Sequence, residues 1–439
     1  MEYIRNRIAI HTLGCKVNQC DTEKLLARLI EEGYDICSFD QTADVYIINT
    51  CTVTHTGDKK SLQIIRRARR LNPTAFIAVC GCMPNGQADN INKITASGAD
   101  FVFDTRKPYE LIEKLEATFS NQRFMTARSE EQSPAIHLNT PTDLLKTRHR
   151  AFIKIQDGCD RYCAYCIVPY VRGPVVSRSP SDILTEAKSY IQGGVKEIVL
   201  TGIQVAAYGY DTGSEFVTLP KLINKLAVHN LRLRLSSIDP WAIDDAFLSA
   251  IDDSPTLCSH FHLSLQSGSD KTLACMNRRY TIKDYSKAAE KLRALRPNMA
   301  LTTDIIVGFP GETNDDFRKS IHFVEKMGFA QIHVFEYSQR TGTQAANFPE
   351  QIPSQIKSTR GKEMRALASD LQQKFLYSQT NTTTTVLFET QTTDTPETWQ
   401  GYSDNYCLVE VQGTNLANTI RDVHIIDIAN DKLIGCLTL

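Results

Sequence analysis

The residues best suited to chemistry are three cysteines, Cys159, Cys163 and Cys166, in the spacing C-x3-C-x2-C. They follow a strand-like apolar run at 151–155 and Gly158, a glycine that permits a sharp backbone bend. Three thiolates are one ligand short of a closed zinc site or a fully ligated [4Fe–4S] cluster. A cluster held here would keep one iron open to a small molecule. Three ordinary buried cysteines or a partial zinc knuckle remain as alternatives.

A second set of cysteines follows predicted strands in the first hundred residues. The apolar pattern predicts strands at 7–13, 44–49, 75–79 and 99–103, with helices at 21–33, where Asp21 is the expected N-cap, and at 59–71. This alternation predicts an open, parallel, flavodoxin-like sheet. Cys15, Cys51 and Cys82 each follow one of the first three strands, and such loops open on one edge of the sheet. We therefore expect these three thiols to converge, again with one ligand missing.

Two asparagines and three further cysteines lie near this second set in the sequence. Asn18 and Asn49 flank two of these cysteines, where they could hydrogen-bond a cluster sulfur or only cap a turn. Cys20, Cys37 and Cys80 are expected to be buried hydrophobes.

The middle of the chain repeats strand and helix. Strands are predicted at 151–155, 196–201, 231–237, 261–267, 301–307 and 331–337. About six such units indicate a partial (β/α)6 barrel, whose chemistry would lie in the loops after the strands. A helix at 352–376 and short strands at 383–389, 406–411 and 423–428 then predict a small β-barrel at the C-terminal end.

Composition and charge exclude some classes of protein. The chain has 439 residues, a net charge of −1 and no apolar run near the ~20 residues that cross a bilayer. The charged N-terminal segment has no signal-peptide core, so we expect a cytoplasmic protein, in which thirteen cysteines favour metal binding over disulfides. The neutral total charge predicts no general affinity for DNA and leaves any nucleic-acid contact to local basic patches.

The cysteine loop, with Tyr165 before its last cysteine, resembles the signature of the radical S-adenosylmethionine superfamily. The segments 12–19, 49–53 and 81–83 (TLGCKVNQ, NTCTV and GCM) resemble the N-terminal domain of the methylthiotransferase family within it. The resemblance implies S-adenosylmethionine and two [4Fe–4S] clusters. It assigns the radical-forming cluster to Cys159, Cys163 and Cys166, and an auxiliary, sulfur-donating cluster to Cys15, Cys51 and Cys82.

The same resemblance implies a set of cofactor-binding residues on the barrel. These are Tyr165, Thr201, Gly202, Ser237, Gln266, Ser267, Asp304, Gly308 and Phe309. Asp239 and Glu336 depart from the family's usual Glu and Pro at those two positions.

The C-terminal segment 401–406 (GYSDNY) resembles the signature of a TRAM domain, an OB-like fold that binds RNA. Candidate RNA-binding residues are Arg66, Arg67, Arg69, Arg70, Arg148, Arg150, Tyr402 and Tyr406, although basic runs are often only solvated and aromatic rings often buried. The expected domains are 1–120 with the auxiliary cluster, a linker at 121–147, the radical S-adenosylmethionine domain at 148–375 and the TRAM domain at 376–439.

The function implied is a tRNA methylthiotransferase. The segment around Cys15 resembles the members that modify N6-threonylcarbamoyladenosine (t6A) in the anticodon loop by exchanging C2–H for C2–SCH3. One S-adenosylmethionine would supply the methyl group, a second the 5′-deoxyadenosyl radical, and an external donor the electron. The alternatives are the isopentenyladenosine tRNA enzyme and, from another class, an iron–sulfur redox sensor that binds RNA without catalysis.

Overall fold

The computed structural model describes residues 6–86, 88–119, 149–213, 217–229, 231–392 and 397–438. The chain divides into two compact units. The first, called here the N-terminal unit, contains residues 1–147 together with 166–173 and 340–342. The second, called the barrel unit, contains 148–165, 174–339 and 343–439. The linker expected at 121–147 lies outside the described residues, as does Arg148, and the expected domain boundaries stay predictions.

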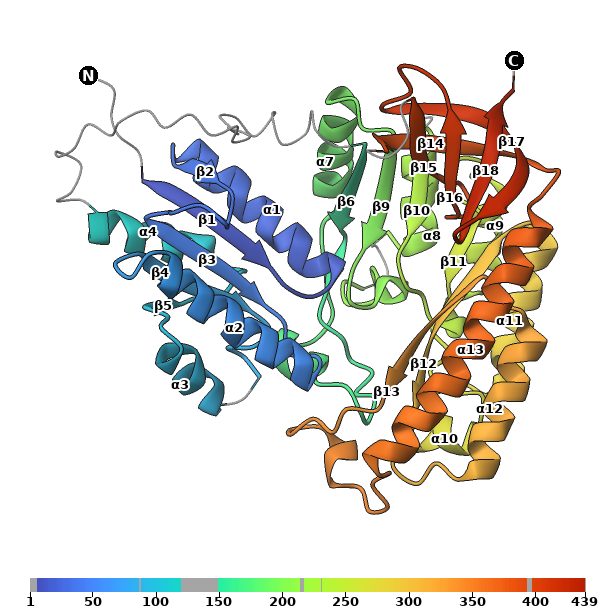
Figure 1. The fold of residues 1–439 in the computed structure, drawn as a ribbon, viewed down its shortest axis with the longest axis horizontal. Helices are drawn as coiled ribbons and strands as arrows, with labels where there is room; N and C mark the ends of the chain where they lie inside the picture. Colours follow the sequence, from blue (N-terminus) through green and yellow to red (C-terminus); the bar gives the residue numbers. More distant parts are fainter. Residues whose placement is uncertain are drawn as a thin grey trace. The chain divides into compact units, whose positions relative to one another are not determined.

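The N-terminal unit is built on a parallel five-stranded sheet of order β2-β1-β3-β4-β5, seen in blue tones in Figure 1. Its strands are β1 (Arg7–Thr12), β2 (Asp35–Cys37), β3 (Val45–Thr50), β4 (Phe76–Gly81) and β5 (Phe101–Val102). Its helices are α1 (Lys16–Glu31), α2 (His55–Leu71), α3 (Ala88–Ala96) and α4 (Pro108–Phe119). This strand order is that of flavodoxin, so the predicted fold class of this part is confirmed.

Both faces of this sheet are buried, which explains its near-continuous apolar strands. Ile8 and Ile47 pack with residues of α1 and α4, whereas Ala9 and Ile48 on the opposite face pack with α2 and α3. All six residues of β3 are buried. Cys80 is fully buried on the α1 side, and Cys20 and Cys37 are buried too, as expected.

Two helix starts differ from the sequence expectation. Helix α1 begins at Lys16 with Cys15 as its N-cap residue, so Asp21 is not the cap but lies buried inside the helix. Helix α2 begins at His55, capped by the side chain of Thr54, and not at 59. In both cases the helix starts directly after a cysteine loop, and only α1 lacks a capping side chain.

The barrel unit contains the six expected strands. They are β6 (Arg150–Lys154), β9 (Glu197–Thr201), β10 (Arg232–Leu235), β11 (His260–His262), β12 (Ala300–Val307) and β13 (Gln331–Glu336). They form two parallel sheets, β10-β9-β6 and β11-β12-β13, joined through a bridge between Ile238 and Leu263. The predicted partial (β/α)6 barrel is thereby confirmed.

One hydrophobic core lies between these strands and the helices outside them. The helices are α7 (Pro180–Gln192), α8 (Leu219–Ala227), α9 (Asp245–Asp252), α10 (Asp270–Cys275), α11 (Ile282–Leu295), α12 (Asn314–Met327) and α13 (Ser354–Ser378). Short strands β7 (Gln156–Asp157) and β8 (Val176–Ser177) pair with each other before and after the cysteine loop.

The C-terminal segment forms a closed barrel of order β14-β15-β16-β18-β17, drawn in red in Figure 1. Its strands are β14 (Thr383–Gln391), β15 (Thr398–Ser403), β16 (Leu408–Gln412), β17 (Thr419–Ala429) and β18 (Lys432–Leu437). The predicted small β-barrel is confirmed, with β15 and β18 in addition to the three expected strands. Among the described residues, every helix is too short or too polar for a membrane span.

Candidate functional site

Cys15, Cys51 and Cys82 lie at the carboxyl edge of three adjacent strands. They follow β1, β3 and β4, which are neighbours in the sheet. A methyl group built on Gly14 would lie 3.3 Å from Sγ of Cys51, so the loop that carries Cys15 rests against that thiol. Burial, with a smaller contribution from the neighbouring Cys15 and Cys51 thiols and against the opposing charge of Arg172, raises the pKa of the Cys82 thiol to about 11. The expected convergence of these cysteines is what the sheet produces.

Gly81 makes the turn into Cys82 possible. Its φ is +95°, and a Cβ there would lie 2.4 Å from Oδ1 of Asn49 and 2.4 Å from the carbonyl oxygen of Thr50. Only glycine fits such a close approach at positive φ.

Asn18 and Asn49 brace the loops around this site. Nδ2 of Asn18 donates to the carbonyl oxygens of Leu13 and Thr50, at 2.7 and 3.1 Å. Its Oδ1 lies 3.8 Å from Sγ of Cys82. Asn49 donates to the carbonyl oxygen of Asn18 at 2.9 Å, so it supports Asn18 without a direct sulfur contact among the interactions described.

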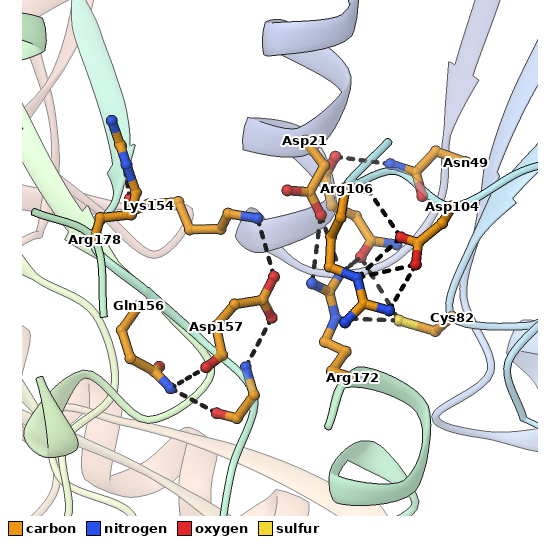
Figure 2. Close-up of polar contacts among 12 residues, drawn as sticks. Asp21, Asn49, Cys82, Asp104, Arg106, Lys154, Gln156, Asp157, Arg172 and Arg178 are labelled. Atoms are coloured by element: carbon orange, nitrogen blue, oxygen red, sulfur yellow. Dashed lines mark hydrogen bonds and ion pairs between the residues drawn. The ribbon is translucent and has the colours of Figure 1, made fainter. Parts of the chain in front are cut away.

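Arg172, which sequence reasoning missed, is the cation of this site. It ends α6 (Val168–Arg172), a helix that groups with the N-terminal unit. Its Nε lies 3.3 Å from Sγ of Cys82, and its guanidinium also contacts Asn18 and lies 3.3 Å from the carboxylate of Asp21. Figure 2 shows Arg172 pointing at Cys82 and Asp21. The side chains of Arg172 and Asp21 are 8% and 5% exposed, so the charge acts in a largely dehydrated setting.

The loop after Cys51 has its own arginine. Arg340, a buried residue that also groups with the N-terminal unit, contacts Thr52 and the carboxylate of Asp58. Thr52 in turn donates to Asp58 at 2.7 Å. The positive charge of Arg172 favours the thiolate form of both Cys82 and Cys51, and Cys15 at the start of α1 faces the positive end of the helix dipole. This environment fits an anionic, sulfur-rich group.

Cys159 and Cys163 lie in the loop that follows β7. Gln156 organises this loop, because its amide donates to the carbonyl oxygens of Asp157 and Gly158 and accepts from the backbone N–H of Gln204 at 2.8 Å. Figure 2 shows the first two of these bonds, with Asp157 also paired to Lys154 at 3.0 Å. Tyr162 between the two cysteines has a φ of +47°, which marks a tight bend.

Two side chains from other loops of the barrel unit contact these thiols. Oε1 of Gln204 accepts from Sγ of Cys159 at 3.3 Å, and Nη1 of Arg278 donates to Sγ of Cys163 at 3.3 Å. Arg278 also pairs with Asp239, a departure from the family pattern that therefore has a defined partner here. Burial raises the pKa of the Cys159 thiol to about 11. Cys166, the third cysteine, lies just before α6.

The residues expected to bind the cofactor fall into two groups. Thr201, Gly202, Ser237 and Gly308 lie at or just after the carboxyl ends of β9, β10 and β12. Gly308 has a φ of +73° and donates its N–H to Glu312 at 2.8 Å. Gln266 has a φ of +72°.

The remaining members of the set are more enclosed. Phe309 is fully buried against Ala164, Met276 and Tyr337, and Tyr165 packs beside the same cluster. The Ser267 hydroxyl is buried 3.2 Å from the Ser320 hydroxyl. Asp304 faces His262. Their cofactor roles stay predictions.

The expected RNA-binding side chains occupy different settings. On α2, Arg66, Arg67 and Arg70 are exposed, whereas Arg69 bonds the carbonyl oxygens of Ala75 and Gly98 and the carboxylate of Asp100, at 2.6–2.8 Å. Tyr402 and Tyr406 stack on each other at 4.8 Å between ring centroids.

Arg150 lies over the Tyr402 ring and pairs with Glu389, and Arg234 lies over Tyr406. These rings and Arg150 therefore serve the packing of the C-terminal barrel within its unit. An RNA contact by them stays a prediction.

Comparisons with known proteins agree with this geometry. The Radical SAM superfamily model matches residues 153–324, and a model described as uncharacterized protein family UPF0004 matches residues 7–104. The chain is thus a radical S-adenosylmethionine enzyme, a class that uses S-adenosylmethionine and a [4Fe–4S] cluster.

Relatives define the family more narrowly. The threonylcarbamoyladenosine tRNA methylthiotransferase MtaB of Bacillus subtilis is 37% identical, over 93% of this chain and 90% of the relative. MtaB of Chlamydia pneumoniae is 34% identical over 98% of both chains. The tRNA-2-methylthio-N(6)-dimethylallyladenosine synthase of Thermoanaerobacter pseudethanolicus is 38% identical over 80% of this chain and 75% of its own. The chain belongs to the radical S-adenosylmethionine methylthiotransferases, and its likeness to MtaB-type members is confirmed.

Solved structures support the fold. The radical S-adenosylmethionine methyltransferase TsrM from Kitasatospora setae matches with a TM-score of 0.54 at 14% identity, over 75% of this chain and 73% of that one. The cobalamin-dependent radical enzyme OxsB matches with a TM-score of 0.51 at 11% identity, over 83% and 56%. At these identities the likeness concerns the fold alone.

Proposed function

We propose that this methylthiotransferase converts N6-threonylcarbamoyladenosine in the anticodon loop of tRNA to its 2-methylthio derivative. The proposal rests on Cys15, Cys51 and Cys82, which follow three adjacent strands at one edge of the sheet. They are separate in sequence from the radical S-adenosylmethionine loop, so they can serve as a second ligand set. A methylthiotransferase needs such a second site because sulfur insertion is distinct from radical formation. The full-length likeness to relatives named for threonylcarbamoyladenosine supports this substrate.

In this proposal each set of three cysteines binds one [4Fe–4S] cluster. When bound, the radical-forming cluster would pass on the electron of an external donor and the auxiliary cluster would supply the sulfur chemistry, and two S-adenosylmethionine molecules would supply a methyl group and a 5′-deoxyadenosyl radical. The chain's own residues position these groups. Gln204 and Arg278 hold the thiols of Cys159 and Cys163, and Asn18 and Arg172 hold that of Cys82.

The site of action would be the cytoplasm, where tRNA is available. Arg66 and Arg70 on α2 are exposed, which suits contact with tRNA phosphates. An unpaired purine in a loop is accessible to an enzyme without melting a duplex.

The second candidate substrate is the isopentenylated adenosine of tRNA. It is favoured by the relatives named tRNA-2-methylthio-N(6)-dimethylallyladenosine synthase, among them one 38% identical over 80% of this chain. Both candidates use the same chemistry at C2 and differ only in the group on N6.

Two measurements test the proposal. Anaerobic reconstitution should give about eight irons per chain, four for each cluster, with an EPR signal that S-adenosylmethionine perturbs and release of 5′-deoxyadenosine. One cluster without cofactor cleavage would contradict it and favour a redox sensor. Mass spectrometry of tRNA nucleosides after gene deletion should show loss of 2-methylthio-N6-threonylcarbamoyladenosine. Loss of the isopentenyl analogue alone would assign the second candidate.

A further inference from the structure

Three potential metal ligands lie together on the three-stranded sheet β11-β12-β13 of the barrel unit. His262 ends β11, Asp304 lies in the middle of β12, and His333 lies opposite Asp304 in the register of β13. One ligand atom from each side chain lies within 4.8 Å of the others. The imidazole rings of His262 and His333 stack with centroids 5.8 Å apart.

Strand alternation places all three on the face of the sheet turned away from the helices. Their sequence neighbours Leu263, Ile305 and Ile332 point into the main hydrophobic core beneath α11, α12 and α13. Adjacent residues of a strand face opposite sides, so His262, Asp304 and His333 share the other face. The side chains of His262 and Asp304 are only 12% and 27% exposed.

The orientation of His262 is that of a metal ligand. Its Nδ1 lies 3.1 Å from the hydroxyl of Thr302, which leaves Nε2 as the free coordinating atom. Nε2 is buried and lies 3.2 Å from Oδ2 of Asp304, yet no atom of the described residues is aligned to hydrogen-bond it. A metal-binding histidine characteristically has one ring nitrogen fixed by such an outer hydrogen bond.

We propose that Nε2 of His262, the carboxylate of Asp304 and an imidazole nitrogen of His333 bind one divalent transition-metal ion such as zinc. Two imidazoles and one carboxylate are a ligand set for zinc or ferrous iron, with positions left open for water or a substrate oxygen. On a tetrahedral ion with bonds of about 2.1 Å, ligand atoms stand roughly 3.4 Å apart. The 3.2 Å between Nε2 of His262 and Oδ2 of Asp304 is close to this spacing. The ligand atom of His333 lies within 4.8 Å of both, so a small movement of its side chain would complete the site.

This site is separate from the six cysteines assigned to the clusters and does not depend on the identity of the tRNA nucleoside. It also assigns Asp304 a use other than contact with S-adenosylmethionine. The site would place a Lewis acid on the inner face of the barrel strands.

The test is zinc binding to the reconstituted holoenzyme, measured by equilibrium dialysis against zinc chloride under anaerobic conditions. Mass spectrometry counts zinc and iron separately. We expect about one zinc per chain with the iron content unchanged, and we expect His262→Asn or His333→Asn to weaken zinc binding by about 100-fold. Thr302→Val, which removes the outer hydrogen bond of His262 together with the contact between Thr302 and Nε2 of His260, should weaken it by about 10-fold.

His322→Asn, at an exposed histidine of α12, is the matched control and should bind zinc normally. His333 is exposed, so its variant is expected to fold, and melting temperature and iron content verify this. Absence of zinc binding, zinc uptake that displaces iron, or equal binding by the His333→Asn variant would each overturn the proposal.

Discussion

Arg172 and Cys82 form the contact that most directly links a charge to the proposed auxiliary site. The guanidinium lies 3.3 Å from the sulfur, and its second partner Asp21 is buried in α1. Burial is the larger influence on the Cys82 thiol and raises its pKa, while Arg172 acts in the opposite direction by favouring the thiolate. A cation held this way favours the more negative state of any cluster that Cys82 binds.

We therefore expect Arg172→Gln to lower the reduction potential of the auxiliary cluster. A unit charge a few ångströms from a cluster, at the effective dielectric of a partly buried site, corresponds to a shift on the order of 100 mV. An EPR-monitored redox titration measures it. Arg172→Lys should restore most of the potential, and Arg106→Gln, at an arginine 57% exposed and paired with Asp104, should leave it unchanged. Equal potentials in Arg172→Gln and wild type would refute this role.

Among the structural elements, α2 carries two kinds of arginine. Arg66 and Arg70 are exposed one turn apart, while Arg69 bonds backbone carbonyls of the loops around Ala75 and Gly98. The run of arginines in the sequence does not show which of them are exposed and which bond the neighbouring loops. The helix thus presents Arg66 and Arg70 to solvent and uses Arg69 to hold neighbouring loops.

For tRNA binding, the double variant Arg66→Gln/Arg70→Gln should weaken affinity and reduce the slope of log K against log salt by about 2 if both residues contact phosphate. Arg69→Gln should instead lower the melting temperature, because it leaves the part-buried carbonyl groups of Ala75 and Gly98 without this donor. Filter binding across a salt series and thermal melting separate the two effects. An unchanged slope in the double variant would remove α2 from the RNA interface.

The turn from β4 into Cys82 depends on Gly81. Gly81→Ala should destabilise the N-terminal unit by roughly 2 kcal/mol or more, since it combines positive-φ strain with overlap at the Asn49 amide and Thr50 carbonyl. Thermal melting and iron content should fall together. Gly328→Ala is the matched comparison, because Gly328 has a φ of +59° with no atom within 4 Å of the added methyl group. If both variants lose the same stability, the close approach at Gly81 does not matter.

On the scale of the whole barrel unit, Glu197 joins the barrel to the C-terminal domain. Its carboxylate pairs with Arg234 at 2.8 and 3.0 Å and with Arg232 at 3.1 Å. Arg234 also donates to the carbonyl oxygens of Ser403 and Asp404 in the C-terminal barrel. Burial alone would raise the pKa of Glu197, but the arginines outweigh it and the net pKa is lowered.

Glu197→Gln should cost about 3–5 kcal/mol in unfolding free energy, because it leaves buried arginine charge without its carboxylate. Since the folded pKa lies below the unfolded one, the wild-type contribution is present above pH ~4.5 and is lost as the pH falls through the folded value. Denaturant unfolding against pH should show this loss in wild type and not in Glu197→Gln. Lys291→Gln, at an exposed pair with Asp245, should change stability by less than about 0.5 kcal/mol.

The alternation of apolar runs was enough to predict most of the architecture. The parallel flavodoxin-like sheet, the six barrel strands and the C-terminal barrel follow from local periodicity, which reflects burial on one or both faces. The short strand β2 was missed because three residues carry too little periodicity, and the start of α1 was misplaced because Cys15 occupies the N-cap position without a capping side chain.

The two incomplete cysteine sets follow from the sequence alone, because the radical loop is local and the loops after parallel strands open on one edge. The charges beside these cysteines, and the histidine–aspartate group of the barrel, are visible only in the folded chain. Arg172 lies far along the chain from Cys82, as Arg278 does from Cys163. His262, Asp304 and His333 come from three separate strands. Such contacts depend on strand register and helix placement, which no local pattern encodes.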